Sequence, residues 1–394
     1  MLGRSCNGFI RHMKKSTWWI LGVIVVLIIV LAVTSNKRET ATDSGPVRVG
    51  AALMLTGPAS LLGELQQKVL PIAVGDVNKN GGINGRPLEL VIEDAAYDPK
   101  TAVSAYQALK QKGLKLFIID GSSPVASTRP LVIADGNFTI AGVATAPSYY
   151  DGNNRSCRIA PTAKLFGPAN AELAIKRGYK NVAVLAGDNE YGRGLADEFT
   201  KTLIAKGGKV VLTEFYNASP AASDYKTNIT KVKAIESSVD AIVFTQALNT
   251  LPAMLKQMSD LGLKKPLISD YPTVDNPALK GDLSVLNGLE YAGIDFVNGD
   301  SSTDSPKAKA FKDAYKAKFD SYPIFLQGAH YDVVMLLSEA IAKVGQDPQK
   351  VADYISGLKD YEGVTGVFSF NSDCEVERKP VFNKIVDGKI IRTE

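Results

Sequence analysis

Short apolar runs alternate with longer amphipathic stretches from residue 47 almost to the end of the chain. The runs are typical of buried β-strands and the stretches are typical of helices. The expected strands are residues 47–53, 88–92, 116–119, 138–141, 182–186, 209–213, 241–245, 266–269 and 289–292. Alternation of strand and helix produces parallel sheets that helices cover on both faces. We therefore expect an α/β fold built from doubly wound parallel sheets.

The length of the chain indicates two domains. It has 394 residues, of which 45% are hydrophobic, and folded domains usually contain about 100 to 200 residues. The alternation falls into two comparable blocks that divide near Pro161. Helical patterns then return, before the last apolar runs. These later segments are residues 305–319, 326–344 and 349–358 as helices, and 366–370 and 381–386 as strands.

A glycine-rich corner at residues 78–87 reads N-K-N-G-G-I-N-G-R-P. Gly81 and Gly82 tolerate the positive φ that ends a helix, and Pro87 is suited to entering an extended segment. The corner therefore fixes where one helix stops and the next strand starts.

The N-terminal region has the order of a membrane anchor. Basic residues precede an apolar run at residues 18–33, and a polar stretch follows it. Sixteen apolar residues span about 24 Å as a helix, and Thr17 and Thr34 can extend the run toward the thickness of a bilayer. Positive charge before the run indicates a cytoplasmic start.

We favour an uncleaved signal anchor at residues 18–34, with residues 1–17 as a basic cytoplasmic tail and 35–46 as a linker. This predicts a single-pass cell-membrane protein whose C-terminal part is extracytoplasmic. A cleaved signal peptide remains the alternative, because small residues occur near Ala32. The lipoprotein cysteine is missing after the run, since Cys6 precedes it.

Composition argues against nucleic-acid binding and against catalysis. The net charge is only +4, and residues 307–320 illustrate how Lys alternates with Asp on expected helix surfaces. The two histidines, His12 and His330, support neither a zinc cluster nor a histidine triad, and the sequence has no phosphate-binding loop. We expect no enzyme activity, no metal and no cofactor.

Three motifs together resemble a known family. They are V-R-V-G-A-A-L-M-L-T-G-P at residues 47–58, the glycine-rich corner followed by L-E-L, and D-x3-D-P from Asp94 to Pro99. This cassette is similar to the first lobe of extracytoplasmic solute-binding proteins of the leucine/isoleucine/valine-binding family, and the resemblance weakens toward the C-terminus.

The resemblance implies a type I periplasmic binding protein fold, in which two parallel-sheet lobes are joined by three hinge crossovers. Lobe 1 is expected at residues 47–160 and 289–365, and lobe 2 at 161–288 and 366–394. Ligands of open α/β sheets bind at the carboxyl ends of the strands.

Two strand ends of lobe 1 carry candidate ligand-binding residues. Ser122 starts a helix after the strand at 116–119, where backbone N–H groups favour an anion, although an ordinary helix cap is the alternative. In the family, this segment and the one after residues 138–141 bind the substrate carboxylate and contact its ammonium group. The matching positions are Ser122, Val143, Ala144 and Thr145.

Lobe 2 is expected to supply the lid. The family pattern D-x-x-Y-G-x-G, whose tyrosine closes over the ligand, matches Asp188 to Gly194 and points to Tyr191, which could instead only pack the helix start. A buried ammonium needs a negative partner. The family places an acidic residue after the strand that here contains Leu267 and Ile268, and Asp270 is the candidate for it. The direct alignment puts Tyr271 at that position and Asp270 one residue earlier, and a solvent-facing loop aspartate is the alternative reading of Asp270.

Two departures from the family alter the expected pocket. Leu62 and Ala247 stand where the family has aromatic residues. The smaller side chains are compatible with a larger or different ligand, such as an aromatic or polar amino acid, an amide, urea or a small aromatic acid.

The cysteines Cys157 and Cys374 match stretches that lie close to the lobe crossovers in the family, so the resemblance allows a disulfide between them without requiring one.

These inferences lead to one functional expectation. The protein is a membrane-anchored extracytoplasmic binding protein that captures an amino acid or related small solute by hinge closure and delivers it to an ABC permease. The alternative is a ligand-sensing ectodomain, or an amide or amino-acid sensor of the same fold, that works with a separate signalling partner.

Overall fold

A computed structural model of the protein describes residues 45–145, 152–218, 224–245, 250–274, 282–296 and 304–393. The expected tail at 1–17, the expected anchor at 18–34 and Ala247 all lie outside these ranges, as does all of the expected linker except residues 45 and 46. Within the described ranges, no helix combines the length and apolar character needed to cross a membrane.

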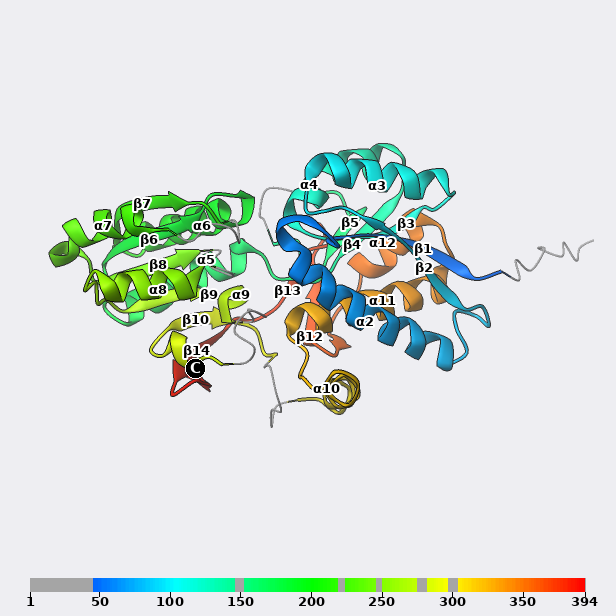
Figure 1. Cartoon of the computed structure of the whole chain (residues 1–394). Coiled ribbons are helices and arrows are strands. Elements are labelled where there is room, and N and C mark those ends of the chain that lie inside the picture. Colours follow the sequence, from blue (N-terminus) through cyan, green and yellow to red (C-terminus); the bar gives the residue numbers. More distant parts are fainter. Residues whose placement is uncertain are drawn as a thin grey trace, which may run out of the picture. The chain divides into compact units, whose positions relative to one another are not determined.

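Five parallel strands form the first sheet, in the order β2-β1-β3-β4-β5 (Figure 1). Their bounds are β1 (Val47–Leu53), β2 (Leu88–Asp94), β3 (Leu116–Ile119), β4 (Phe138–Ala141) and β5 (Ser156–Arg158). Adjacent residues of β3 face opposite sides of the sheet, since Ile118 belongs to one apolar cluster and Phe117 to another. This double burial explains why the strands are continuous apolar runs.

Helices cover both faces of this sheet. Apolar side chains of α2 (Ser60–Lys79) and α11 (Phe325–Val344) share the cluster of Ile118, whereas those of α3 (Pro99–Gln111) and α4 (Ser122–Ala134) share the cluster of Phe117. Because α11 comes from the far end of the chain, lobe 1 is assembled from two separate stretches. We use lobe 1 for the first sheet and its helices.

The second sheet has seven strands in the order β15-β14-β10-β9-β8-β6-β7. Five are parallel, namely β6 (Asn181–Gly187), β7 (Lys209–Tyr216), β8 (Ala241–Thr245), β9 (Leu267–Asp270) and β10 (Glu290–Gly293). The terminal hairpin of β14 (Val381–Val386) and β15 (Lys389–Arg392) adds to the sheet in the antiparallel sense. We call this sheet and its helices lobe 2.

Helices also cover both faces of the second sheet. Side chains of α5 (Ala163–Lys176) and α6 (Glu190–Ala205) pack with Val182 and Val184 of β6, whereas α7 (Lys226–Ala234) and α8 (Leu251–Asp260) contribute to the cluster that contains Ala183 and Leu185. The expected doubly wound α/β architecture is therefore present in both lobes.

The chain crosses between the lobes three times: after β5, after β10 and before β14. The boundaries differ from the expected ones at two places. Residue 289 was expected to begin the return to lobe 1, but β10 pairs with β9 in lobe 2. Periodicity marks an apolar run as a strand without saying which sheet it joins, and this is why the prediction was wrong there.

The second difference lies near residue 366, where lobe 2 was expected to resume. Instead β12 (Gly366–Phe370) pairs with β11 (Tyr361–Gly363) and β13 (Val376–Glu377) in a small antiparallel sheet. A bridge between Arg158 and Glu375 joins this segment to the end of β5. The return to lobe 2 therefore comes only with β14. The other α-helices in the described ranges are α9 (Tyr271–Val274), α10 (Pro306–Phe319) and α12 (Pro348–Ser356).

The glycine-rich corner has the structure that its sequence predicts. Helix α2 ends at Lys79 and strand β2 begins at Leu88, with Gly81 and Gly82 at φ of 95° and 70°. The side chain of Asn78 ties the two elements together, because it accepts the N–H of Leu88 at 2.7 Å and donates to the carbonyl of Leu88 at 3.0 Å.

Candidate ligand-binding site

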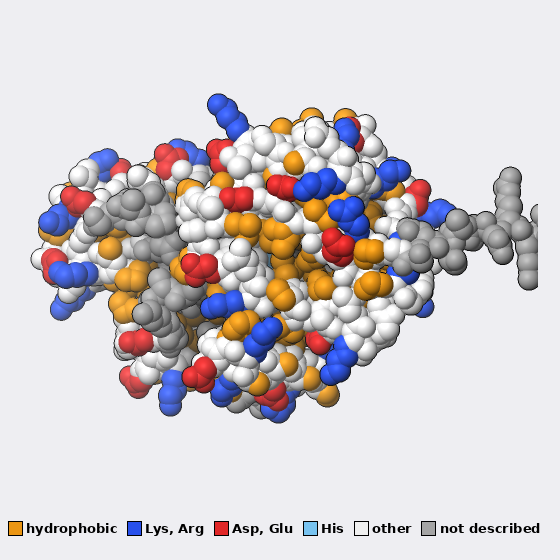
Figure 2. Space-filling view, turned by 45° about the vertical axis from the view of Figure 1, so that its right-hand side comes forward, with side chains coloured by type: hydrophobic (Ala, Val, Ile, Leu, Met, Phe, Trp, Pro, Cys, Tyr) orange, Lys and Arg blue, Asp and Glu red, His pale blue; other side chains and the backbone are white. Residues whose placement is uncertain are grey.

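A cavity of about 120 Å³ is lined by residues that follow the carboxyl ends of strands in both lobes. Six residues expected from the sequence line it: Leu62, Ser122, Val143, Thr145, Tyr191 and Tyr271. On the face drawn in Figure 2, hydrophobic side chains gather toward the middle, while charged side chains are spread around them. Strand ends from two sheets thus meet at one apolar site.

The lobe 1 wall presents two hydroxyl-bearing residues. Ser122 begins α4 directly after Gly121, and Thr145 follows β4. The carbonyl of Thr145 accepts the N–H of Ala163 at 3.1 Å, which holds this segment against the start of α5. The N-terminus of α4 carries backbone N–H groups and the positive end of a helix dipole, so an anion is favoured at this wall.

Gly121 is needed where α4 begins. Its φ is 87°, a region that side-chain-bearing residues rarely adopt. A Cβ added there would lie 2.7 Å from the ring of Tyr97. The close approach lets Tyr97 reach the cavity beside Ser122.

Ala144 does not join the cavity wall among the described residues, although it was expected to touch the ligand. Its side chain is fully buried, and its carbonyl accepts a hydrogen bond at 2.9 Å from Nη1 of Arg158. The chain turns at this position, so Val143 and Thr145 face the cavity while Ala144 faces the protein interior.

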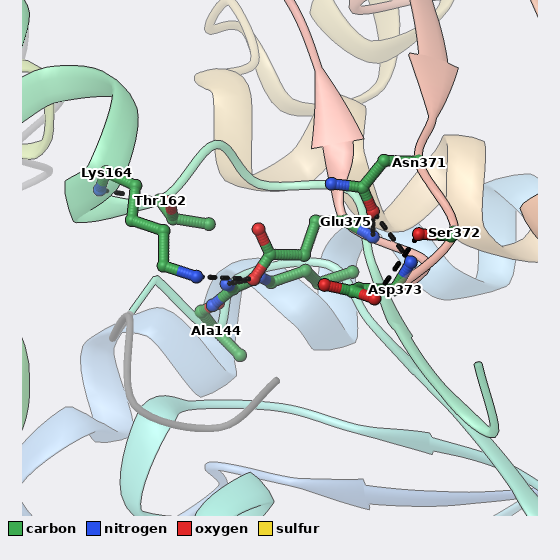
Figure 3. A network of polar contacts seen from close by, with 8 residues as sticks. Ala144, Thr162, Lys164, Asn371, Ser372, Asp373 and Glu375 are labelled. Atoms are coloured by element: carbon green, nitrogen blue, oxygen red, sulfur yellow. Dashed lines mark hydrogen bonds and ion pairs between the residues drawn. The ribbon is translucent and has the colours of Figure 1, made fainter. Parts of the chain in front are cut away.

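Figure 3 shows the polar cluster that contacts the carbonyl of Ala144. The cluster lies where lobe 1 meets the first crossover. Nη2 of Arg158 donates to Oε1 of Glu375 at 2.5 Å, and Nζ of Lys164 lies 3.6 Å from the same oxygen. The side chain of Asn371 accepts hydrogen bonds from the backbone N–H groups of Asp373 and Glu375.

Beside this polar cluster, Cys157 and Cys374 form a disulfide with a Cα–Cα distance of 4.7 Å.

Tyr191 stands on the lobe 2 wall at the start of α6, where the side chain of Asn189 caps the helix by accepting the N–H of Gly192. Burial raises the pKa of Tyr191 well above its usual value of 10, and the nearby carboxylate of Asp270 adds to the increase. The same carboxylate lies within hydrogen-bond reach of the Tyr191 hydroxyl. The hydroxyl oxygen can also accept a hydrogen bond from a ligand group.

Asp270 and Tyr271, both candidates from the sequence, take different places. Tyr271 lines the cavity, and its ring packs on Phe166 and Phe325 with centroid distances of 5.8 and 5.4 Å. Asp270 ends β9, is fully buried, and accepts the hydroxyl of Thr273 at 2.5 Å. Asp270 therefore lies behind the wall that Tyr271 and Tyr191 form.

The sequence reasoning missed several cavity residues. Ligands of open α/β sheets bind at the carboxyl ends of strands, and we call this the strand-end rule. Tyr97 follows the carboxyl end of β2 and lies inside the D-x3-D-P motif, so this rule could have identified it. Burial raises the pKa of Tyr97 to about 12. Residues 324–326 form another part of the wall at the start of α11, and no local motif announces their role because they come from a helix after the second crossover.

The side chains that line the cavity are largely apolar and suit the binding of a small molecule. Leu62 lines the cavity together with Met54 and Phe325, and these side chains suit an apolar ligand body. Ala247 lies outside the described residues. Within the described ranges, no group of three or more His, Cys, Asp or Glu side chains is arranged to hold a metal ion.

Two α/β lobes with a cavity at their strand ends define a two-lobed solute-binding protein. Residues 46–388 match the periplasmic binding protein family, and the chain belongs to this family. The type I periplasmic binding protein fold expected from the motifs is thereby confirmed.

A leucine-, isoleucine-, valine-, threonine- and alanine-binding protein of Pseudomonas aeruginosa is 30% identical over 339 residues, which cover 84% of this chain and 87% of that protein. Among solved structures, the branched-chain amino acid transporter substrate binding protein of Streptococcus pneumoniae in complex with isoleucine has a TM-score of 0.76 at 23% identity, and covers 88% of this chain and 99% of its own.

A solute binding protein of an ABC transporter from R. palustris, in complex with benzoate, has a TM-score of 0.77 at 18% identity, and covers 89% of this chain and 96% of its own. These structural likenesses show the fold. The homologues are solute-binding proteins.

Proposed function

We propose that this protein captures an amino acid or a related small carboxylate outside the cytoplasm and delivers it to an ABC permease. The observation that carries the proposal is a cavity whose walls come from both lobes, with Ser122 and Thr145 on one side and Tyr191 and Tyr271 on the other. A ligand that contacts both walls stabilises the closed arrangement of the lobes.

The carboxylate of the ligand binds at the lobe 1 wall. The hydroxyls of Ser122 and Thr145 and the N–H groups at the start of α4 are donors suited to an anion. This gives the ligand a defined orientation, with its charged end toward lobe 1.

The remainder of the ligand lies against lobe 2. The Tyr191 hydroxyl donates to or accepts from it, and an ammonium group, where the ligand has one, is attracted by the buried carboxylate of Asp270 behind Tyr191. An acid without an ammonium group lacks this attraction. Asp270 therefore distinguishes amino acids from simple acids.

The apolar lining selects the body of the ligand. Leu62 and Met54 present aliphatic surface, and Tyr97 presents an aromatic ring. Relatives of the same fold were solved with isoleucine and with benzoate. Both ligands combine one carboxylate with a compact apolar body, and we assign this class to the present site.

A membrane anchor keeps the binding lobes near a permease. Residues 18–34 anchor the protein as a single membrane span with residues 1–17 in the cytoplasm, as the basic residues before the apolar run indicate. The linker at 35–46 tethers the lobes on the extracytoplasmic side. Localisation of a C-terminal fusion by protease accessibility in intact cells tests this topology.

A thermal-shift screen of the full-length protein tests the ligand class. The panel contains leucine, isoleucine, phenylalanine, benzoate, 3,4-dihydroxybenzoate, urea and acetamide. A ligand at about 100 times its Kd adds roughly 2.7 kcal/mol to the free energy of unfolding. We expect a carboxylate to give the largest shift. Urea or acetamide as the strongest ligand contradicts the proposal, and mass spectrometry checks that the bound solute is recovered unchanged.

A further inference from the structure

Three fully buried polar side chains meet beneath the lobe 1 wall of the cavity. Asp120 follows β3, Gln66 lies on α2 and His330 lies on α11. Nε2 of Gln66 donates to Oδ2 of Asp120 at 2.6 Å, and Nε2 of His330 contacts the same oxygen. We call these three residues the buried triad.

Each member of the buried triad also bonds a backbone group of the cavity wall. The N–H of Val143 donates to Oδ1 of Asp120 at 2.9 Å, and the N–H of Met54 donates to Oε1 of Gln66 at 3.2 Å. Nδ1 of His330 donates to the carbonyl of Leu326 at 2.7 Å. Met54 follows β1, Val143 follows β4 and Leu326 lies on α11, and all three line the cavity.

The wall and the buried triad are packed without spare room. A Cβ added to Gly142 would lie 2.9 Å from the ring of His330, so the backbone just before Val143 rests on the imidazole. The N–H of Gly121 donates to the carbonyl of Val143 at 3.1 Å. A displacement of the buried triad is therefore passed to Gly121 and to Ser122 next to it.

The triad is joined internally by hydrogen bonds as well. Nε2 of Gln66 lies 2.9 Å from Nε2 of His330, so the amide of Gln66 contacts both of the other members. Buried polar groups are costly unless they are hydrogen-bonded, and these contacts hold the three side chains in one arrangement.

We propose that Asp120, Gln66 and His330 are positioning residues that set the geometry of the ligand site through Met54, Val143 and Leu326. This inference rests on the proposed function, since it concerns how the same cavity holds its ligand. None of the three side chains reaches the cavity, and each acts through the backbone that it bonds.

The first test measures hydrogen exchange at the backbone amides of Met54 and Val143 in the ligand-free, full-length protein. Gln66→Met keeps an unbranched side chain but removes the hydrogen bonds of Gln66 to Met54, Asp120 and His330. We expect exchange at both amides to accelerate roughly tenfold or more, because the loss frees one amide and displaces Asp120 from the other. Unchanged exchange at Val143 overturns the proposal.

Tyr106→Phe is the matched control. Its hydroxyl is buried in the same lobe and bonds Asp135 and Asn137 at 2.8 and 2.9 Å, away from the cavity. It should leave exchange at Met54 and Val143 unchanged even where its loss of thermal stability equals that of Gln66→Met. Equal acceleration in both variants reduces the triad to a general contribution to stability and overturns the proposal.

A spectroscopic test does not depend on Gln66. Nitrogen-15 labelling of the histidines gives signals from His12 and His330, and His12→Gln identifies which is which. We expect Nδ1 of His330 to carry a proton, because the carbonyl of Leu326 that it faces can only accept. An unprotonated Nδ1 in the unsubstituted protein contradicts this bond and overturns the proposal.

The last test measures the Kd of isoleucine and of benzoate by calorimetry. We expect Gln66→Met and Asp120→Asn to bind roughly tenfold more weakly or worse, as occurs when residues that orient binding groups are removed. Tyr106→Phe should retain the affinity. If the unsubstituted protein binds neither probe, the proposed ligand class fails while hydrogen exchange still decides the positioning role. If it binds and Gln66→Met keeps that affinity, the positioning role fails alone.

Discussion

The ring of Tyr271 stands edge-on to the ring of Phe325, with centroids 5.4 Å apart and an interplanar angle of 90°. Tyr271 follows the last residue of β9 in lobe 2, and Phe325 begins α11 in lobe 1. Both rings line the cavity, so this pair joins the lobe 1 wall to the lobe 2 wall. The contact is one that the strand-end rule cannot supply, because only one of its partners follows a strand.

Tyr271→Leu should weaken ligand binding and lower the free energy of unfolding. An edge-on aromatic pair contributes about 0.5–1.5 kcal/mol beyond its buried area, which corresponds to roughly 2- to 10-fold in Kd. Calorimetry with isoleucine measures the change. Tyr361→Leu is the control, because Tyr361 pairs with Phe368 at 5.3 Å outside the cavity, and it should leave the Kd unchanged.

Thr145→Val should selectively weaken the binding of carboxylates. The substitution preserves shape but removes a hydroxyl, and a hydrogen bond to a charged group contributes about 1.5–3 kcal/mol. Ser127→Ala is the control, since Ser127 lies on α4 and bonds the carbonyl of Pro124 without lining the cavity. Equal losses in the two variants contradict the carboxylate site.

Gly121→Ala should lower both stability and affinity. Alanine rarely adopts the positive φ of this position, and such backbone strain costs about 1–3 kcal/mol. The new Cβ would also collide with the ring of Tyr97. Gly136→Ala provides the comparison, because Gly136 has a φ of 67° but no neighbour within 4 Å of a Cβ. Chemical denaturation of both variants separates the φ penalty, which they share, from the contact with Tyr97.

The pH dependence of stability at alkaline pH should reflect Tyr97. Burial raises the pKa of its phenol to about 12 from a usual value of 10. The unfolded chain therefore loses this proton first, so the stabilisation is complete below pH 10 and is lost as the pH rises toward 12. Denaturation across this range should give a shallower decline for Tyr97→Phe. An equally steep decline shows that the Tyr97 phenol is not protected.

Loss of the Cys157–Cys374 disulfide should destabilise the protein without abolishing ligand binding. The bond joins residues 217 positions apart, and removing a native disulfide usually costs about 2–5 kcal/mol. Cys157→Ser with Cys374→Ser, examined by chemical denaturation and by calorimetry, separates the two effects. Complete loss of binding in a folded double variant contradicts a purely structural role.

Much of this architecture follows from local patterns. The continuous apolar strands predict parallel sheets buried on both faces, and the two clusters on either side of β3 show why. The location of Ser122 after a strand follows because parallel strands place their carboxyl ends at one edge of the sheet, where ligands bind. Tyr191 also follows a strand, but the family pattern D-x-x-Y-G-x-G was needed to single it out.

Other features depend on contacts between distant segments. The membership of β10 in lobe 2 is decided by its pairing with β9 and β14, and Phe325 reaches the cavity only because α11 packs beside α2. The family resemblance predicted that Ala144 touches the ligand, but its side chain is buried away from the cavity and its carbonyl accepts a hydrogen bond from the guanidinium of Arg158. No local pattern carries this information.

The central claim is that one ligand contacts both lobes, and calorimetric titration of isoleucine and benzoate into three forms of the full-length protein tests it most directly. The forms are the unsubstituted protein, Ser122→Ala and Tyr191→Phe. We predict a single site whose Kd rises by roughly 10-fold or more in Ser122→Ala and by roughly 2- to 10-fold in Tyr191→Phe, as loss of one hydrogen bond implies. Unchanged affinity in either variant contradicts a ligand held between the two walls.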